Sequence, residues 1–179
     1  MKDKLYFVGG VKGVGKTSLI NELRRNHKIG YINTGDLVRN YRRMKKEDKQ
    51  ITNSVDLFIF NNLIFLKDSI VDTHFAGRTE NGDYVKGLDD YFLNALSLKK
   101  NIELVLVTAS VDDIYERRAK DVLRRERILD KSDIEREIHA TNYFIMNYAK
   151  IINKKPYFIL NNDFNQAYNE LEKIIINPQ

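Results

Sequence analysis

The sequence predicts a three-layer α/β/α fold, in which helices cover both faces of a five-stranded parallel sheet. First, short and continuously apolar runs alternate along the chain with longer segments whose apolar residues recur every three or four positions. Second, the short runs lack polar alternation, which is typical of parallel strands buried on both faces. Third, 179 residues without repeats or low-complexity tracts fit one domain over residues 1–179.

The apolar runs and the helical periodicity fix the expected order of elements. The predicted strands are 5–8, 28–33, 69–72, 103–108 and 157–160. Helical periodicity covers 16–26, 54–68, 88–98, 111–128, 132–152 and a last segment around Ala167, Leu171 and Ile174. Thr34 or Asp36 is the expected cap of a helix after the second strand. Glycines among polar residues predict a loop or small hairpin over 76–87.

The composition excludes several classes of protein. The absence of cysteine excludes a disulfide scaffold, a cysteine zinc site and a thiol nucleophile, and three histidines are too few for a histidine-rich metal site. The net charge of +5 suits an anionic small molecule as well as nucleic acid. The start, MKDKLYFVGG, shows no apolar leader, and no apolar run approaches the roughly 18 residues of a membrane span. We therefore expect a cytoplasmic protein without membrane contact.

One motif specifies a phosphate site. Residues 10–17, GVKGVGKT, match the pattern G-x-x-x-x-G-K-[ST] in full, with a predicted strand before them and a predicted helix after them. The glycines let backbone N–H groups wrap around phosphates, Lys16 should reach the β and γ phosphates, and the Thr17 hydroxyl should ligate Mg²⁺. The expected cofactors are therefore ATP and Mg²⁺, on Gly10, Val11, Lys12, Gly13, Val14, Gly15, Lys16, Thr17 and Ser18.

A phosphate loop serves several kinds of protein, and two of them fit the sequence poorly. A GTPase needs N-K-x-D to read guanine, but the nearest string, NKKP at 153–156, ends without a carboxylate. A motor or remodelling ATPase usually has an apolar strand that ends in Asp-Glu. Here the strand ends at Asp72, which Thr73 and His74 follow, so a carboxylate is present for the magnesium site but no adjacent base for water.

A small-molecule kinase needs no strong base, because phosphoryl transfer depends on positioning and on cations that absorb charge. The sequence supplies such cations within one short window: Arg117, Arg118, Arg124, Arg125 and Arg127. A solvated helix face is the alternative for this cluster. Arginine forks match phosphate oxygens, so a catalytic role is favoured in a chain that has a phosphate loop. Asp72 ends a central strand, at the sheet edge where open α/β proteins bind ligands.

These residues resemble the archaeal-type adenylate kinases. The resemblance rests on the loop motif, on IVDTH at 70–74 followed by KGL at 86–88, and on Arg117-Arg118 before Arg125-x-Arg127. It implies a nucleoside monophosphate kinase fold with a segment for the monophosphate, here 34–68, and a short helical lid, here 112–131. The implied reaction transfers a phosphoryl group between ATP and AMP, with Mg²⁺.

The resemblance also assigns roles to residues. Arg125 and Arg127 would close on the triphosphate, with Arg117 and Arg118 at the base of the lid. Asp72 would lie at the magnesium end of the site or near the acceptor, and His74 would face the acceptor pocket. The acceptor residues are then Thr34, Gly35, Asp36, Arg39, Asp72, His74 and Gly87. From the residues alone, 34–36 is equally an ordinary strand-to-helix turn, and Arg39 equally lies on a solvated helix face.

Two departures from the family leave the acceptor open. Position 12 is Lys, and the stretch between Thr34 and Asp72 is shorter than the family's by about a helical turn or more. Another small phosphate-bearing or hydroxyl acceptor is therefore an alternative to AMP, as is an ATPase with a protein or nucleic-acid partner. We do not expect nucleic acid, because the basic clusters flank the nucleotide site, whose phosphates already account for them. The resemblance leaves a homo-oligomer open.

Overall fold

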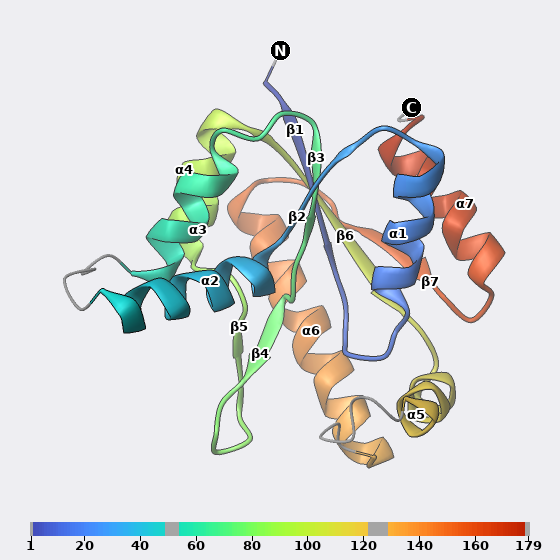
Figure 1. Cartoon of the computed structure of the whole chain (residues 1–179). Helices are drawn as coiled ribbons and strands as arrows, with labels where there is room; N and C mark the ends of the chain where they lie inside the picture. Colours follow the sequence, from blue (N-terminus) through green and yellow to red (C-terminus); the bar gives the residue numbers. More distant parts are fainter. Residues whose placement is uncertain (1, 49–53, 122–128, 178–179) are drawn as a thin grey trace.

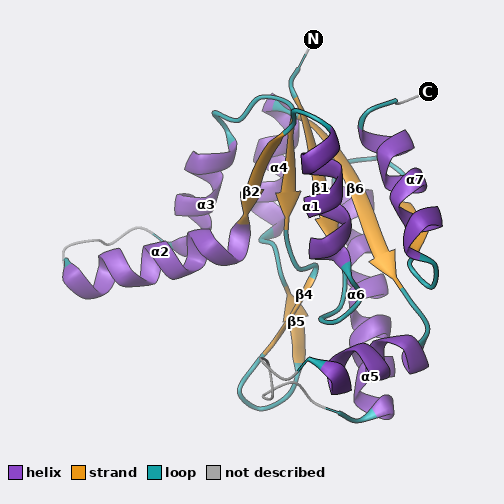
Figure 2. Cartoon of the chain, turned by 45° about the vertical axis from the view of Figure 1, so that its right-hand side comes forward, coloured by secondary structure: helices purple, strands orange, loops and turns teal. Residues whose placement is uncertain are grey.

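All five strands of the main sheet run parallel, with the first strand of the chain at its centre. A computed structural model describes residues 2–48, 54–121 and 129–177. The strands are β1 (Lys4–Gly9), β2 (Gly30–Asn33), β3 (Ser69–Asp72), β6 (Asn101–Thr108) and β7 (Tyr157–Leu160), in the order β2-β3-β1-β6-β7. Figure 2 shows the strands in orange among the purple helices. Their carboxyl ends therefore share one edge of the sheet, where the segments after β1, β2 and β3 meet.

Helices cover both faces of this sheet, which confirms the predicted three-layer architecture. In the described residues they are α1 (Lys16–Asn26), α2 (Thr34–Glu47), α3 (Val55–Leu63), α4 (Asp90–Lys99), α5 (Val111–Lys120), α6 (Lys131–Ile151) and α7 (Phe164–Ile175). On one side α1 and α7 pack together against the strands, and on the other lie α3, α4 and α6 (Figure 1).

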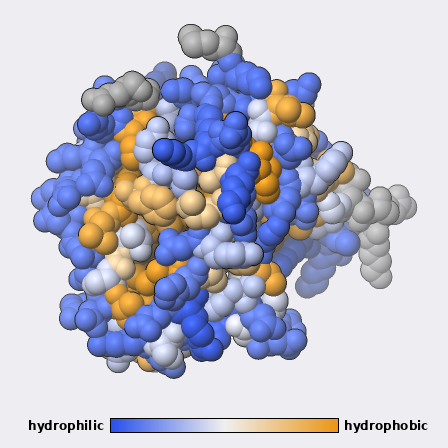
Figure 3. Space-filling model, turned by 180° about the vertical axis from the view of Figure 1, so that it is seen from behind, coloured by the Kyte–Doolittle hydropathy of each residue, from blue (hydrophilic) through white to orange (hydrophobic). Residues whose placement is uncertain are grey.

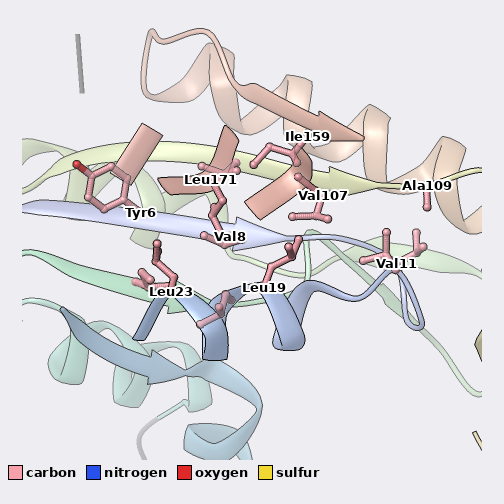
Figure 4. Packing of buried hydrophobic residues seen from close by; sticks show 14 of the residues in the cluster. Tyr6, Val8, Val11, Leu19, Leu23, Val107, Ala109, Ile159 and Leu171 are labelled. Carbon is pink, nitrogen blue, oxygen red and sulfur yellow. The ribbon is translucent and has the colours of Figure 1, made fainter. Parts of the chain in front are cut away.

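Each face has its own buried apolar core. The core under α1 and α7 includes Val8, Leu19, Ile159 and Leu171 (Figure 4). The opposite core includes Phe7, Leu93 and Tyr148. Successive residues of β1, Phe7 and Val8, belong to different cores because side chains alternate across a strand. Because both faces of β1 are buried, its residues 5–8 form a continuous apolar run.

The segment 76–87 is a hairpin, one of the two expected forms. Its antiparallel strands are β4 (Ala76–Arg78) and β5 (Tyr84–Lys86), and α6 anchors it. An Arg78 guanidinium nitrogen lies 2.7 Å from the buried carboxylate of Asp133. The Tyr148 hydroxyl accepts the Leu88 N–H at 3.0 Å and lies 3.1 Å from the Leu88 carbonyl oxygen.

Three element boundaries differ from the sequence prediction. The helix predicted over 54–68 ends earlier, at Leu63. The helix predicted over 111–128 ends at Lys120, with Asp121 as its C-cap, and residues 122–128 lie outside the described part of the chain. The cap of α2 is neither Thr34 nor Asp36 but Asn33, because its side-chain oxygen accepts the Asp36 N–H at 3.1 Å.

The described surface is mostly polar but has exposed apolar side chains. On the face seen from behind, orange patches lie among blue ones (Figure 3). Exposed large apolar residues include Tyr143 and Met146 on α6 and Phe158 and Leu160 on β7. A homo-oligomer would cover surface of this kind, and it stays a prediction. Among the described residues, no helix combines the length and apolar character needed to cross a membrane.

Removing the Tyr148 hydroxyl should destabilise the fold. Tyr148→Phe leaves the ring in the core but deprives the Leu88 N–H of its partner, so the free energy of unfolding should fall by about 1–3 kcal/mol. Urea denaturation measures this change. Tyr143→Phe is the control, because that side chain is 65% exposed. Equal unfolding free energies for the two variants would contradict the role given to the hydroxyl.

Candidate active site

The phosphate loop joins β1 to α1, and we expect its backbone N–H groups to form a cradle for phosphates. Gly13 and Gly15 have φ values of 87° and 90°, the left-handed region that glycine adopts without strain. Gly15 is also the N-cap of α1, and it supplies no side-chain cap. No acidic residue lies in the first turn of this helix. The N-terminus of α1 therefore offers its donors and its positive end to an anion.

Lys16 and Asp72 form a buried ion pair at the carboxyl edge of the sheet. Lys16 is 7% exposed and Asp72 is 1% exposed, and the Lys16 ammonium contacts Oδ1 of Asp72. Burial lowers the pKa of Lys16 to about 8. The structure thus brings together the two charged residues that the motif and the end of β3 predicted.

Of the predicted acceptor residues, Thr34 lies beside this pair. The Thr34 hydroxyl is 3.3 Å from the Asp72 carbonyl oxygen and 3.1 Å from the Thr73 hydroxyl. Gly87 packs against His74 so closely that a Cβ there would lie 1.9 Å from the His74 carbonyl oxygen. Only glycine fits this contact, which closes the base of the β4-β5 hairpin.

His74 faces the phosphate loop, and Nδ1 of its ring is 3.4 Å from the Gly10 carbonyl oxygen. The ring reaches solvent, yet desolvation by the surrounding protein, and then the charge of Lys16, lower the pKa of His74 to about 4. The ring is therefore neutral at pH 7. Gly35 lies in the first turn of α2, where Asp36 and Arg39 form an exposed ion pair.

The two arginines of α5 contact the phosphate loop itself. Arg117 is half-buried and donates to the carbonyl oxygens of Val14 at 3.0 Å and Asn161 at 2.7 Å. Arg118 is buried and donates to the Lys12 carbonyl oxygen at 2.9 Å. In this structure both side chains brace the loop, and their contact with phosphate stays a prediction. Arg124, Arg125 and Arg127 lie outside the described residues.

Two residues that brace the loop were not assigned a site role from the sequence. Glu137 accepts the Lys12 N–H at 3.2 Å and pairs with Arg118 at 2.6 Å. Asn161 follows β7 and donates from Nδ2 to the Val14 carbonyl oxygen at 2.7 Å. A signal existed for each residue. Glu137 is a carboxylate within the apolar stripe of α6, and Asn161 directly follows β7 at the carboxyl edge of the sheet.

The residues present fit a magnesium nucleotide. The loop and the start of α1 supply donors for phosphates, and the Thr17 hydroxyl is exposed beside them. Within the described residues, no group of three or more His, Cys, Asp or Glu side chains gathers as a metal cage. Mg²⁺ is usually held by one or two protein ligands together with substrate phosphates. Thr17 and Asp72 suit that arrangement.

The parallel sheet, the phosphate loop and its buried lysine define a P-loop kinase fold. A protein-family model described as AAA domain matches residues 9–136, so the chain belongs to this family. Fold and family together identify a kinase-type P-loop phosphotransferase.

Named proteins resemble the chain over most of its length. The adenylate kinase of Methanocaldococcus jannaschii is 28% identical, and the match covers 98% of this chain and all of that protein. The YorR protein of Bacillus subtilis, solved with phosphorylated GDP, has a TM-score of 0.66 at 14% identity, covering 96% of this chain and 95% of that one. Shikimate kinase of Acinetobacter baumannii has a TM-score of 0.56 at 16% identity, covering 99% and 95%.

A methyl group at Gly15 should damage the phosphate cradle. In Gly15→Ala the new Cβ would lie 2.4 Å from Nδ2 of Asn161, and the positive φ is unfavourable for alanine. We expect ATP affinity, measured by calorimetry, to fall by about tenfold or more, since strain of this kind costs about 1–3 kcal/mol. Gly77→Ala is the control, because its Cβ would come no closer than 3.6 Å to a neighbour. Unchanged affinity in Gly15→Ala would disprove the cradle.

Proposed function

We propose that the protein is a Mg²⁺-dependent nucleoside monophosphate kinase that converts ATP and AMP into two ADP. One observation carries this proposal: the buried Lys16–Asp72 pair lies between the phosphate loop and the start of α2. A donor phosphate on the loop and an acceptor near Thr34 would therefore meet at one carboxylate. The near full-length similarity to an adenylate kinase supports AMP as the acceptor.

The donor half of the reaction follows from the phosphate loop. The triphosphate would lie on residues 10–18, and Lys16 would contact the β and γ phosphates. Thr17 and Asp72 would hold Mg²⁺, Asp72 directly or through water. When bound, the metal neutralises charge on the phosphate oxygens. Glu137, Arg118 and Asn161 keep the loop in shape, so the donors need not rearrange during the reaction.

The acceptor half uses the segment 34–68 and the residues after β3. An oxygen of the acceptor phosphate would attack the γ phosphorus in line, and the bond to the oxygen that bridges the β and γ phosphates would break as ADP leaves. No covalent enzyme intermediate forms. Gly35, Asp36 and Arg39 would face the acceptor at the start of α2. His74, neutral at pH 7, would face it from the other side as a hydrogen-bonding group rather than as a cation.

Water must be excluded for transfer to dominate over hydrolysis. We assign this task to a lid over residues 112–131, of which the structure describes 112–121 and 129–131. Its arginines, Arg117, Arg118, Arg125 and Arg127, would approach the transferring group. Together with residues 10–18 and 34–68, this lid would complete a single kinase domain over residues 1–179. A small nucleotide is then the partner, and the cytoplasm the expected location.

Loss of the loop ammonium should abolish turnover. Lys16→Met removes the charge that contacts the phosphates, so kcat/KM for ATP should fall by at least about 100-fold, as expected for a preorganised charge at the transferring group. A coupled assay of ADP production measures it. Lys173→Met removes an exposed ammonium on α7 and should change nothing. Full activity in Lys16→Met would refute the assignment of the site.

The acceptor is tested with Mg-ATP and a panel that contains AMP, CMP, UMP, GMP, dTMP, shikimate, plain nucleosides and water alone. ADP production that depends on AMP is the expected result. If ADP production depends on another acceptor, the kinase mechanism stands and that acceptor takes the place of AMP as the substrate. Turnover in water that no acceptor changes would overturn the proposal in favour of an ATPase.

A further inference from the structure

The carboxylate of Asp72 is held by both of its oxygens, and each oxygen has a different partner. Oδ1 contacts the Lys16 ammonium. Oδ2 accepts two hydrogen bonds, from the Tyr31 hydroxyl at 3.1 Å and from Nδ2 of Asn33 at 3.0 Å. Asp72 is only 1% exposed, so these protein groups take the place that water would fill around an exposed carboxylate.

Both donors to Oδ2 come from β2, and strand pairing sets their positions. β2 and β3 pair in parallel, with Asn33 opposite Asp72 and Tyr31 opposite Ile70. Because side chains alternate along a strand, Tyr31 and Asn33 lie on the same face of β2. Both side chains donate their hydrogen bonds to Asp72 on that face.

Each donor is itself fixed in place. The guanidinium of Arg24 lies 4.1 Å from the centre of the Tyr31 ring, so the ring is stacked under α1. The Asn33 side chain uses its oxygen to accept the Asp36 N–H at 3.1 Å, which leaves Nδ2 directed at Asp72. Rotation of either side chain would break a second contact. The carboxylate therefore has one preferred orientation, with Oδ1 toward the phosphate loop.

From this arrangement we propose that Tyr31 and Asn33 are positioning residues that orient Asp72 for the magnesium nucleotide. They touch neither nucleotide nor metal in this proposal, and they act only through Oδ2. Residues that hydrogen-bond a metal ligand typically change metal affinity or activity by about 10–100-fold when removed. The inference rests on the proposed function for its consequence in catalysis, but its central claim concerns only Mg²⁺ and nucleotide.

Asn33 adds a link between the two halves of the site. Its side-chain amide caps α2, the helix that carries Thr34, Gly35 and Asp36. The same amide also donates to Asp72 on the donor side of the site. A shift of the first turn of α2 on acceptor binding would therefore act on the orientation of Asp72. Tyr31 has no such contact with α2 in the described hydrogen bonds. The two residues should thus differ in how they affect the acceptor.

The test uses two variants, one that removes the hydroxyl donor and one that replaces the amide donor by a shorter side chain, and both keep the surrounding contact. Tyr31→Phe retains the ring under Arg24, and Asn33→Ser retains an oxygen that caps α2. Tyr168→Phe is the matched control, because it also loses a hydroxyl hydrogen-bonded to an Asn and a Glu, but between α1 and α7. Urea unfolding checks that every variant is folded.

The main readout is the affinity for a fluorescent ADP analogue in EDTA and in Mg²⁺. In EDTA, both site variants should bind the ADP analogue with an affinity within about twofold of the unmutated protein's. The increase in affinity on adding Mg²⁺ should be about tenfold smaller in the variants. Tyr168→Phe should keep both values. An unchanged gain in either folded site variant would overturn the proposal. An equal loss with and without Mg²⁺ would also overturn it, since that result indicates a merely structural role.

Turnover separates the two residues further. With the acceptor identified by the panel, Tyr31→Phe should lower kcat and leave KM for the acceptor unchanged, whereas Asn33→Ser should change both. If kcat and the acceptor KM change in the same way in both variants, Asn33 does not link Asp72 to the acceptor through α2. If no acceptor is phosphorylated, the proposed function fails, but the Mg²⁺ readout still decides whether Tyr31 and Asn33 position Asp72.

Discussion

The structure depends on the burial of one ion pair, Lys16 with Asp72. Two charges removed from water are stable only when each has a partner and the remaining hydrogen-bonding capacity is used. Here the sheet supplies that setting, because β1 leads into the loop that carries Lys16 and β3 ends at Asp72. The pair also keeps the positive charge of Lys16 at the place where we expect phosphates to bind. A bound nucleotide would replace one anionic partner of the lysine by another.

The phosphate loop keeps its shape through contacts with parts of the chain far away in the sequence. Arg118 and Glu137, from α5 and α6, hold the first half of the loop through Lys12. Asn161 and Arg117 hold the second half through Val14. A loop fixed at both halves presents preorganised donors, and this lowers the cost of binding phosphates. The brace also ties the loop to α5, where the proposed lid begins.

Much of the fold was predictable from the sequence, because strands buried on both faces leave continuous apolar runs such as 5–8. The loop motif located Lys16 and Thr17, and the end of β3 located Asp72. The contacts that support these residues were not predictable. Tyr31 and Asn33 reach Asp72 only because Asn33 is in register with it across β2 and β3. Glu137 meets Lys12 only after α6 packs beside the loop. A carboxylate within an apolar stripe marks Glu137 as unusual, but the sequence does not say which residue it will contact.

The position of β1 at the centre of the sheet also bears on how the chain folds. Its two neighbours, β3 and β6, lie about 60 and 95 residues later in the sequence, so β1 can pair only with strands that are distant along the chain. Contacts between distant parts of a chain form slowly, because loop closure must come first. The phosphate loop follows β1 and is held by hydrogen bonds to Glu137 and Asn161. It should therefore be among the last features to acquire its native shape.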